Sequence, residues 1–265
     1  MNGKAVYVGI DRGGTWARFC GLDRAGRRVF SEKHPSPLIK KFPELIKKVL
    51  DANAVPPTAR CVIATKGAIA NPWKDGYLKK EMAGRLNVVE VMSDMEASVR
   101  AALHGRAGIA VLAGTGSVAC GINGARMAKA GGLGPVLGDE GSAYNVAAVS
   151  CAVAEGKAVC FAPEKVAKIA FSAKDVLAAA KRGDRAAVGA VMLGAVKLAR
   201  QAHSVVAELG LESPLLFTYD GSMMKDDFFR KHVLAALTLY SGITRFTFVP
   251  PCESAPWCAA RAAKK

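Results

Sequence analysis

The stretch VLAGTGSVACGINGARMAKAGGLGPVLGDEGS, residues 111–142, contains two glycine-rich loops that follow short apolar runs. The first loop is GTGS at residues 114–117, and the second, at residues 131–142, carries Asp139 and Glu140. Glycine allows positive φ angles and close approach of the backbone, so successive amide groups can converge on anionic oxygens. The hydroxyl groups of GTGS add further donors. The segment therefore predicts a phosphate-binding loop followed by an acidic loop that opens onto a helix.

Alternating apolar residues on both sides of this segment predict two copies of one α/β unit. In each copy a glycine turn joins the first two strands of an antiparallel meander, and helices and further strands follow. We expect an N-terminal lobe of residues 1–106, joined by a C-terminal helix at 255–265, and a C-terminal lobe of residues 107–254, with a hinge near 105–108. The expected strands are residues 5–10, 17–22, 28–32, 61–64, 88–92, 109–113, 118–122, 126–130, 215–219 and 245–249, and the expected helices are residues 42–53, 95–103, 141–153, 163–171, 173–181, 185–209, 226–239 and 255–263.

The composition limits the class of protein. A chain of 265 residues can form two medium domains. Its formal net charge of +15 favours anionic ligands. The basic residues are dispersed and have no interleaved aromatic residues, so nucleic acid is not the expected partner. No uncharged run suits a bilayer, and the first residues enter a strand pattern without the apolar core of a signal peptide, which predicts a cytoplasmic protein without membrane contact.

The cysteines are scattered and form no CxxC pair, which favours reduced thiols over a disulfide framework or a zinc site. Most lie among apolar neighbours. The seven are Cys20, Cys61, Cys120, Cys151, Cys160, Cys252 and Cys258.

Acidic residues follow two of the expected strands. Asp11 precedes a Gly-Gly-Thr turn, where a carboxylate suits Mg²⁺ held through water and the backbone suits phosphate. The same residues are also common in plain hairpins. Ser93 and Glu96 have the spacing of a capping box, with Ser93 as the N-cap and Glu96 returning the hydrogen bond. That arrangement leaves Asp94 at the carboxyl end of a strand, where active-site acids commonly occur.

Together these segments resemble the BadF/BadG/BcrA/BcrD ATPase family, and within it the N-acetylglucosamine kinase-like proteins of the actin-like ATPase superfamily (ASKHA). The residues that carry the resemblance are GIDRGGT at 9–15, Ser93 with Asp94, AGTGS at 113–117, and the loop and helix start at 131–144. The resemblance implies an α/β fold of two RNase H-like lobes, with ATP and Mg²⁺ in a nucleotide cleft between them.

The resemblance also implies a role for individual residues. Asp94 matches the family's catalytic base, and Asp11 matches the aspartate that holds Mg²⁺ at the first phosphate loop. The residues implied to bind ATP are Gly13, Gly14, Thr15, Gly114, Thr115, Gly116, Ser117, Ala170, Gly221 and Ser222. Those implied to bind the sugar are Gly132, Leu133, Gly134 and Asp139.

Several positions depart from the family pattern. Arg12 and Trp16 stand beside the first phosphate loop in place of small or polar residues, and Leu133 replaces an aromatic residue at the sugar. The asparagine that binds the amino sugar in the family has no counterpart in HPSPL at residues 34–38. The phosphoryl-transfer residues are thus retained, while sugar-recognition positions differ.

The expected function is ATP-dependent phosphorylation of a sugar or amino sugar, with a homodimer allowed. A second hypothesis is a BadF-type ATPase that drives electron transfer to a partner dehydratase or reductase, which requires a cysteine-ligated iron–sulfur cluster between subunits. A third is a non-catalytic nucleotide or sugar sensor, or a basic nucleic-acid binder on the same frame. The presence of Asp11, Asp94 and Asp139 favours the kinase, because a binding protein has little need of a base.

Overall fold

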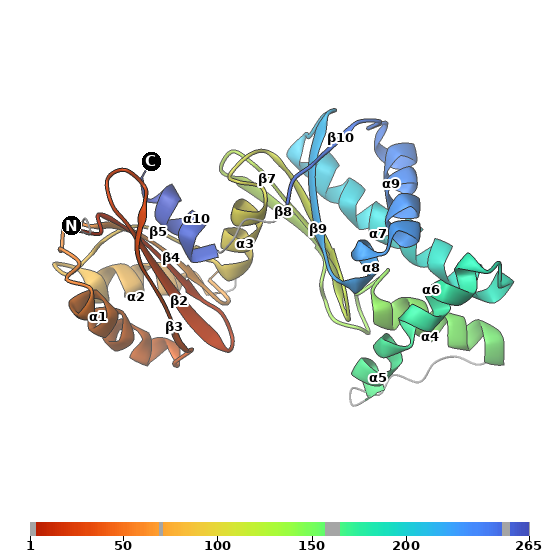
Figure 1. Cartoon of the computed structure of the whole chain (residues 1–265), viewed down its shortest axis with the longest axis horizontal. Coiled ribbons are helices and arrows are strands. Elements are labelled where there is room, and N and C mark those ends of the chain that lie inside the picture. The colour runs from red at the N-terminus through yellow and green to blue at the C-terminus, as the bar shows by residue number, and fades with distance from the viewer. Residues whose placement is uncertain (1–3, 69–70, 157–164, 251–254, 265) are drawn as a thin grey trace. The chain divides into compact units, whose positions relative to one another are not determined.

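The computed structural model describes residues 4–68, 71–156, 165–250 and 255–264. The chain divides into two compact units (Figure 1). Unit 1 consists of Met1–Gly105 together with Cys252–Lys265, and unit 2 is Arg106–Pro251. The last segment of the chain therefore belongs to the same unit as the first.

Unit 1 is built on a five-stranded mixed sheet in the order β3-β2-β1-β4-β5. The first three strands form an antiparallel meander, whereas β1, β4 and β5 run parallel. The carboxyl ends of β1, β4 and β5 therefore lie at one edge of the sheet. The strands are β1 (Tyr7–Arg12), β2 (Trp16–Leu22), β3 (Arg28–Pro35), β4 (Arg60–Thr65) and β5 (Asn87–Ser93).

Helices cover both faces of this sheet because alternate residues of its central strands are apolar on each side. One face of β1 and β4, with Ile10 and Ile63, packs against α1 and α2. The other face, with Val62 and Ala64, packs against α3 and α10. The helices of unit 1 are η1 (Ile39–Lys41, a 3₁₀ turn), α1 (Phe42–Ala52), α2 (Trp73–Met82), α3 (Asp94–Ala102) and α10 (Ala255–Ala262).

Unit 2 repeats the topology of unit 1. Its sheet has the order β8-β7-β6-β9-β10, with an antiparallel meander followed by two parallel strands. The strands are β6 (Gly108–Ala113), β7 (Ser117–Asn123), β8 (Arg126–Gly131), β9 (Leu215–Asp220) and β10 (Phe246–Phe248). The helices are α4 (Ala143–Glu155), α5 (Val166–Phe171), α6 (Ala173–Lys181), α7 (Arg185–Leu209), α8 (Ser222–Lys225) and α9 (Asp227–Ser241).

The long helix α7 organises the core of unit 2. Its apolar stripe is buried against the sheet and against α4, α6 and α9. Asp184 caps its first turn by accepting a hydrogen bond from Ala187 N at 2.8 Å, and Gly210 ends it with φ near +62°. These local signals make the predicted helix at residues 185–209 correct to the residue.

Most of the strands and helices expected from the sequence are confirmed, but α2 and α8 were not predicted. In α2 only Leu78 and Met82 are buried, and Gly76 lies inside the helix, so its sequence has no apolar stripe. No expected helix covers the short α8. The start of the helix expected at residues 163–171 lies outside the described residues, and α5 begins at Val166.

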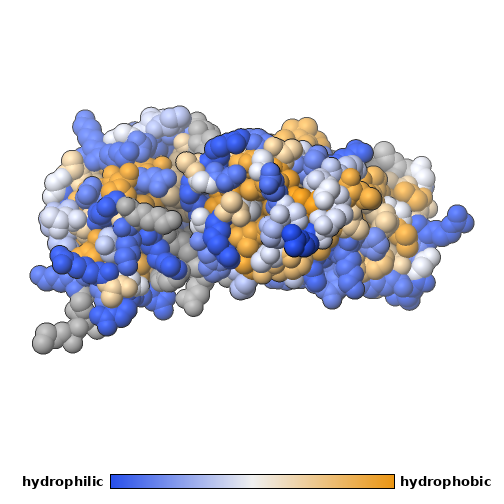
Figure 2. Space-filling model, turned by 90° about the horizontal axis from the view of Figure 1, so that it is seen from above, coloured by the Kyte–Doolittle hydropathy of each residue, from blue (hydrophilic) through white to orange (hydrophobic). Residues whose placement is uncertain are grey.

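The described helices include none that is long and apolar enough to cross a membrane. Hydrophilic side chains cover much of the face shown in Figure 2, with hydrophobic residues gathered in patches between them. The described cysteines are free thiols: Cys20, Cys61 and Cys120 are buried and Cys151 is exposed. Burial raises the pKa of Cys20 and of Cys120 to about 11, so both thiols are protonated at neutral pH. Cys160 and Cys252 lie outside the described residues.

Candidate active site

The parallel strands of unit 1 end in a row of polar residues. The register pairs Arg12 of β1 with Thr65 of β4, and Thr65 with Ser93 of β5. Asp11 precedes this row and Asp94 follows it. Residues separated by more than 80 positions in sequence are therefore brought to one sheet edge, the usual place for ligands in open α/β sheets.

Asp11 is almost completely buried and forms an ion pair with Arg18. The two residues face each other across the β1–β2 hairpin, and Arg18 Nη1 lies 3.1 Å from Asp11 Oδ2. Burial raises the pKa of Asp11 above its ordinary value, the hydrogen bond and charge of Arg18 lower it in part, and the charge of Asp94 raises it further. Arg18 therefore helps to keep a buried carboxylate ionised.

The first glycine loop is tied to the segment that follows β3. Gly13 N donates to Trp16 O at 3.0 Å, which closes the hairpin. Ser36 then fixes the loop from the side, since its hydroxyl donates to Gly13 O at 2.7 Å and its amide donates to Thr15 O at 2.9 Å. Gly14 and Thr15 remain exposed at the tip. A Cβ added at Gly14 would lie 3.5 Å from Lys66 Nζ, so a cationic side chain stands beside the loop.

Asp94 is the first residue of α3 and is half-buried. Ser93 caps this helix, with its hydroxyl accepting a hydrogen bond from Glu96 N at 3.0 Å, as predicted. The second half of the predicted capping box is wrong, because the Glu96 carboxylate instead accepts two hydrogen bonds from Arg100, at 2.9 and 2.8 Å. Arg100 lies one turn later on the same helix and offers a charged partner. The cap leaves the Asp94 carboxylate outside the capping interaction.

The GTGS loop of unit 2 lies directly against the turn after β9. Gly114 N donates to Gly116 O at 2.9 Å, and Gly114 O accepts from Ala143 N at the start of α4 at 2.7 Å. A Cβ added at Gly221 would lie only 2.3 Å from Ala113 O, and Gly221 has φ near +95°. Only glycine fits this contact. The turn at Gly221, where ATP is expected to bind, and the GTGS loop are thus packed backbone to backbone.

Asp139 lies over the same loop. A Cβ added at Gly116 would lie 2.7 Å from Asp139 Oδ2, so a side chain at that position would displace the carboxylate. Ser117 has a different environment from Thr115: it is buried, and its hydroxyl donates to Glu140 O at 2.8 Å. Gln201 of α7 donates to the Glu140 carboxylate at 2.6 Å. The Ser117 hydroxyl therefore joins the GTGS loop to the acidic loop.

The loop that carries Leu133 projects into solvent. It is closed by a hydrogen bond from Gly132 N to Gly138 O at 3.0 Å, and Gly138 N donates to Gly134 O at 2.9 Å. Leu133 is 66% exposed in this closed loop. The structure therefore places Gly132, Leu133 and Gly134 on one compact turn.

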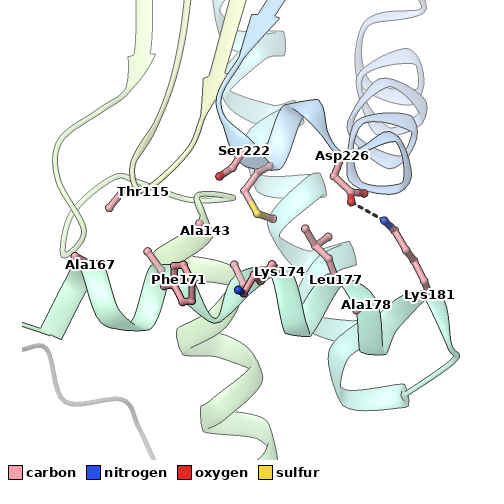
Figure 3. A pocket seen from close by; sticks show the side chains of 13 residues that line it. Thr115, Ala143, Ala167, Phe171, Lys174, Leu177, Ala178, Lys181, Ser222 and Asp226 are labelled. Carbon is pink, nitrogen blue, oxygen red and sulfur yellow. Dashed lines mark hydrogen bonds and ion pairs between the residues drawn. The ribbon is translucent and has the colours of Figure 1, made fainter.

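A pocket of about 480 Å³ opens beside the GTGS loop of unit 2. Thr115 and Ser222 lie on one side, and α5 and α6 present Phe171 and Lys174 on the other (Figure 3). Ala170 of α5 also lines the pocket. The ion pair between Lys181 and Asp226, 2.5 Å long, lies at one end of the pocket. Three of the residues expected to contact ATP, from three separate parts of the sequence, therefore line one pocket: Thr115, Ala170 and Ser222.

Sequence reasoning missed the other residues of this pocket. Their helical spacing was visible, because the expected Ala170 and the missed residues recur at intervals that place them on one face: Ala167, Phe171, Lys174, Leu177, Ala178 and Lys181. Lys174 Nζ lies 3.9 Å from the centroid of the Phe171 ring. What the sequence lacked was any sign that this face lies opposite Ser222.

The residues of unit 1 fit a metal that arrives with a phosphate ligand. Among the described residues, no three His, Cys, Asp or Glu side chains gather into a metal site. Mg²⁺ usually keeps several waters and takes one or two carboxylates together with substrate phosphates. Arg18 contacts Oδ2 of Asp11, so Oδ1 is the oxygen that would hold a water of the metal.

The Asp11–Arg18 pair gives an expected pH dependence. The pKa of Asp11 is already raised, and Arg18→Gln removes the hydrogen bond and the charge that lower it. The carboxyl will then protonate at a higher pH. If Asp11 orients Mg²⁺ bound with ATP, as the resemblance implies, loss of ATP binding on acidification should begin at a higher pH in the variant. Titrating ATP affinity against pH by calorimetry measures this shift.

Arg18→Lys is the matched control, because it retains the positive charge and should move the titration less. Identical acid limits for the wild type and Arg18→Gln would contradict the role given to Arg18.

Comparisons with known proteins agree with this arrangement. A model of the BadF/BadG/BcrA/BcrD ATPase family matches residues 8–238. The N-acetylmuramic acid/N-acetylglucosamine kinase of Clostridium acetobutylicum is 31% identical over 156 residues, which cover 52% of this chain and 50% of that protein. The match thus spans about half the length of this curated relative.

Solved structures show the same fold across the chain. The ROK hexokinase from Thermus thermophilus aligns with a TM-score of 0.60 and 16% identity over 97% of each chain. A Chromobacterium violaceum protein, proposed to be an N-acetylglucosamine kinase, aligns with a TM-score of 0.57 and 17% identity over 99% of each chain. Together with the two repeated five-stranded sheets, these likenesses confirm the expected α/β fold.

Proposed function

Because the chain belongs to the BadF/BadG/BcrA/BcrD ATPase family, we propose that it is an ATP-dependent kinase of a sugar or amino sugar. The observation that carries the proposal is the pocket of unit 2, where Thr115, Ala170 and Ser222 converge beside a glycine loop. The partial match to a kinase of N-acetylmuramic acid and N-acetylglucosamine supports a sugar as the acceptor.

In this proposal unit 2 holds the nucleotide. The Phe171 ring and the small side chains of α5 and α6 offer an apolar surface to a base, and Thr115 and Ser222 offer hydroxyl donors. In the proposal, backbone amides around Gly114 and Gly116 donate hydrogen bonds to the phosphate oxygens of ATP, and the Asp139 carboxylate lies over this loop. The Asp139 carboxylate can accept a hydrogen bond from a hydroxyl group of the sugar.

In this proposal unit 1 supplies the general base and the carboxylate that orients Mg²⁺. Asp94 accepts the proton of a sugar hydroxyl as its oxygen attacks the γ-phosphorus and ADP leaves. Mg²⁺ bound with ATP would neutralise charge on the phosphates, and Asp11 is the carboxylate placed to orient it. The exposed tip at Gly14 and Thr15, with Lys66 beside it, offers further donors to phosphate oxygens. Such a transfer depends mainly on positioning and electrostatic stabilisation.

A coupled ADP-release screen tests the proposed function. Hexoses, hexosamines and peptidoglycan-derived sugars are offered with Mg²⁺ and ATP, and at least one should raise ADP release above the rate with ATP alone. The product of the active sugar should gain one phosphoryl group by mass spectrometry. If no sugar raises ADP release, the kinase proposal fails.

The nucleotide pocket can be tested separately from turnover. Ala170→Leu adds a branched side chain inside the pocket and should weaken ATP binding by about tenfold or more, because overpacking costs on the order of 1–3 kcal/mol. Ala154→Leu is the matched control, since Ala154 is exposed on α4 and does not line the pocket. Equal ATP affinity in both variants, with both folded by circular dichroism, would place the nucleotide elsewhere.

A further inference from the structure

Arg12 is held firmly at the end of β1. Its Nε and Nη2 atoms both donate to Pro37 O, at 3.0 and 2.7 Å, and Nη1 donates to Thr65 Oγ1 at 3.3 Å. The guanidinium carbon lies 5.6 Å from the centroid of the buried Phe42 ring. These contacts orient a planar cation that would otherwise be mobile. Pro37 follows Ser36, which ties the first glycine loop, so the whole segment after β3 is anchored.

Arg12 lies at the same sheet edge as the carboxyl groups of Asp11 and Asp94. Burial lowers the pKa of Arg12 and the charge of Asp94 raises it again in part, so the two side chains interact electrostatically. They do not form an ion pair among those made by the described residues. The strand register places Arg12 and Ser93, the residue before Asp94, at the ends of the two strands that flank β4, roughly 10 Å apart, so one small ligand can reach both Arg12 and Asp94.

The guanidinium group retains hydrogen-bonding capacity. Arginine has five N–H groups, and the described residues Pro37 and Thr65 receive three of its hydrogen bonds. Terminal N–H groups of a fixed guanidinium match the paired oxygens of a carboxylate or a phosphate. A neutral sugar can accept hydrogen bonds from these N–H groups, but it has no negative charge to pair with the guanidinium. Arg12 thus favours an anionic substituent on the ligand whose hydroxyl faces Asp94.

We propose that Arg12 determines acceptor specificity by pairing with an anionic group, a carboxylate or a phosphate, on the sugar that is phosphorylated. This inference rests on the proposed kinase function. The Pro37 carbonyl that anchors Arg12 belongs to the HPSPL segment at residues 34–38. A sugar acid or a sugar phosphate then meets Arg12 with its anionic group and Asp94 with its hydroxyl.

The test compares neutral sugars with derivatives that carry one anionic substituent. Glucose is measured against glucuronate and against glucose 1-phosphate, and N-acetylglucosamine against its 3-O-lactyl ether, by ADP release and by calorimetric binding. Wild-type protein should favour at least one anionic member of a set over its neutral parent. Arg12→Gln should weaken binding of that anion by about 10- to 100-fold, the usual effect of a charge-assisted hydrogen bond. It should leave ATP affinity and the neutral parent nearly unchanged, and rising salt should reduce the preference in the wild type.

Control variants separate recognition from structure. Arg12→Lys keeps the charge and should retain part of the preference, and Arg27→Gln, a highly exposed arginine paired with Asp23, should retain all of it. If Arg12→Gln does not fold, the wild-type preference and Arg12→Lys decide the question. The inference is overturned if neutral sugars bind as well as the anions, or if Arg12→Gln weakens both classes equally. Preference for the carboxylate or for the phosphate identifies the group. Calorimetry decides these outcomes even without turnover, whereas absence of ADP release with every sugar counts against the kinase itself.

Discussion

Replacing Asp94 with asparagine is expected to lower kcat for sugar phosphorylation by about 10²- to 10⁴-fold, the usual contribution of a general base. Asparagine has nearly the same shape but cannot take up the proton of the sugar hydroxyl. Its side-chain oxygen can still accept the hydrogen bond that Met95 N donates to Asp94 Oδ1 at 3.0 Å, so the start of α3 should remain intact. ATP affinity should not change, because Asp94 has no role in ATP binding in the proposal.

Asp75→Asn is the matched control for this experiment. Asp75 is a surface carboxylate on α2 that pairs with Lys79, so the same chemical change there should leave kcat unaltered. Both variants are compared with the wild type by initial rates at saturating sugar and ATP. A normal kcat in Asp94→Asn would show that another group accepts the proton.

Replacing Gly9 with alanine is expected to cost at least about 3 kcal/mol of folding free energy, the upper range for overpacking a core. An added Cβ would lie 1.9 Å from Pro256 O and 2.3 Å from Ala260 N, both backbone atoms of α10. Backbone cannot move aside as a flexible side chain can, so α10 must leave its place on β1. Thermal unfolding followed by circular dichroism should show a melting temperature lower by roughly 10 °C or more.

The control is Gly76→Ala, because a Cβ at Gly76 meets nothing within 4 Å and the residue lies inside α2. There alanine should stabilise the helix by roughly 0.5–1 kcal/mol. If Gly9→Ala melts together with the wild type, the packing of α10 on β1 is not as close as described. Loss of α10 would also uncover the sheet that carries Asp11 and Arg12.

Local signals allowed much of the fold to be predicted. The meanders, the long helix α7 and the cap at Ser93 follow from apolar periodicity and from residues a few positions apart. The helix α2 was missed because its few buried residues, Leu78 and Met82, form no stripe and Gly76 interrupts it. Burial by the rest of unit 1, rather than local preference, holds that helix.

Partners chosen by long-range packing could not be predicted. Arg18 was not singled out, although it faces Asp11, because its role depends on the register of the β1–β2 hairpin. The Ser117 hydroxyl was expected at a phosphate, but the structure gives it Glu140 O as an acceptor 23 residues later in the sequence. The Glu96 carboxylate accepts a hydrogen bond from Arg100, one turn away on the same helix, rather than from the backbone amide of Ser93 as a capping box requires.

The sequence by itself determined the order of strands and helices, the duplication of the α/β unit and the positions of the glycine loops. These depend on periodicity and on backbone preferences that act over a few residues. Only the tertiary structure decided which groups meet, such as Arg12 with the Pro37 carbonyl and the Thr65 hydroxyl, and which residues line the pocket, such as Ala170 and Ser222. Such contacts depend on strand register and helix packing between distant segments, and no local pattern of residues specifies them.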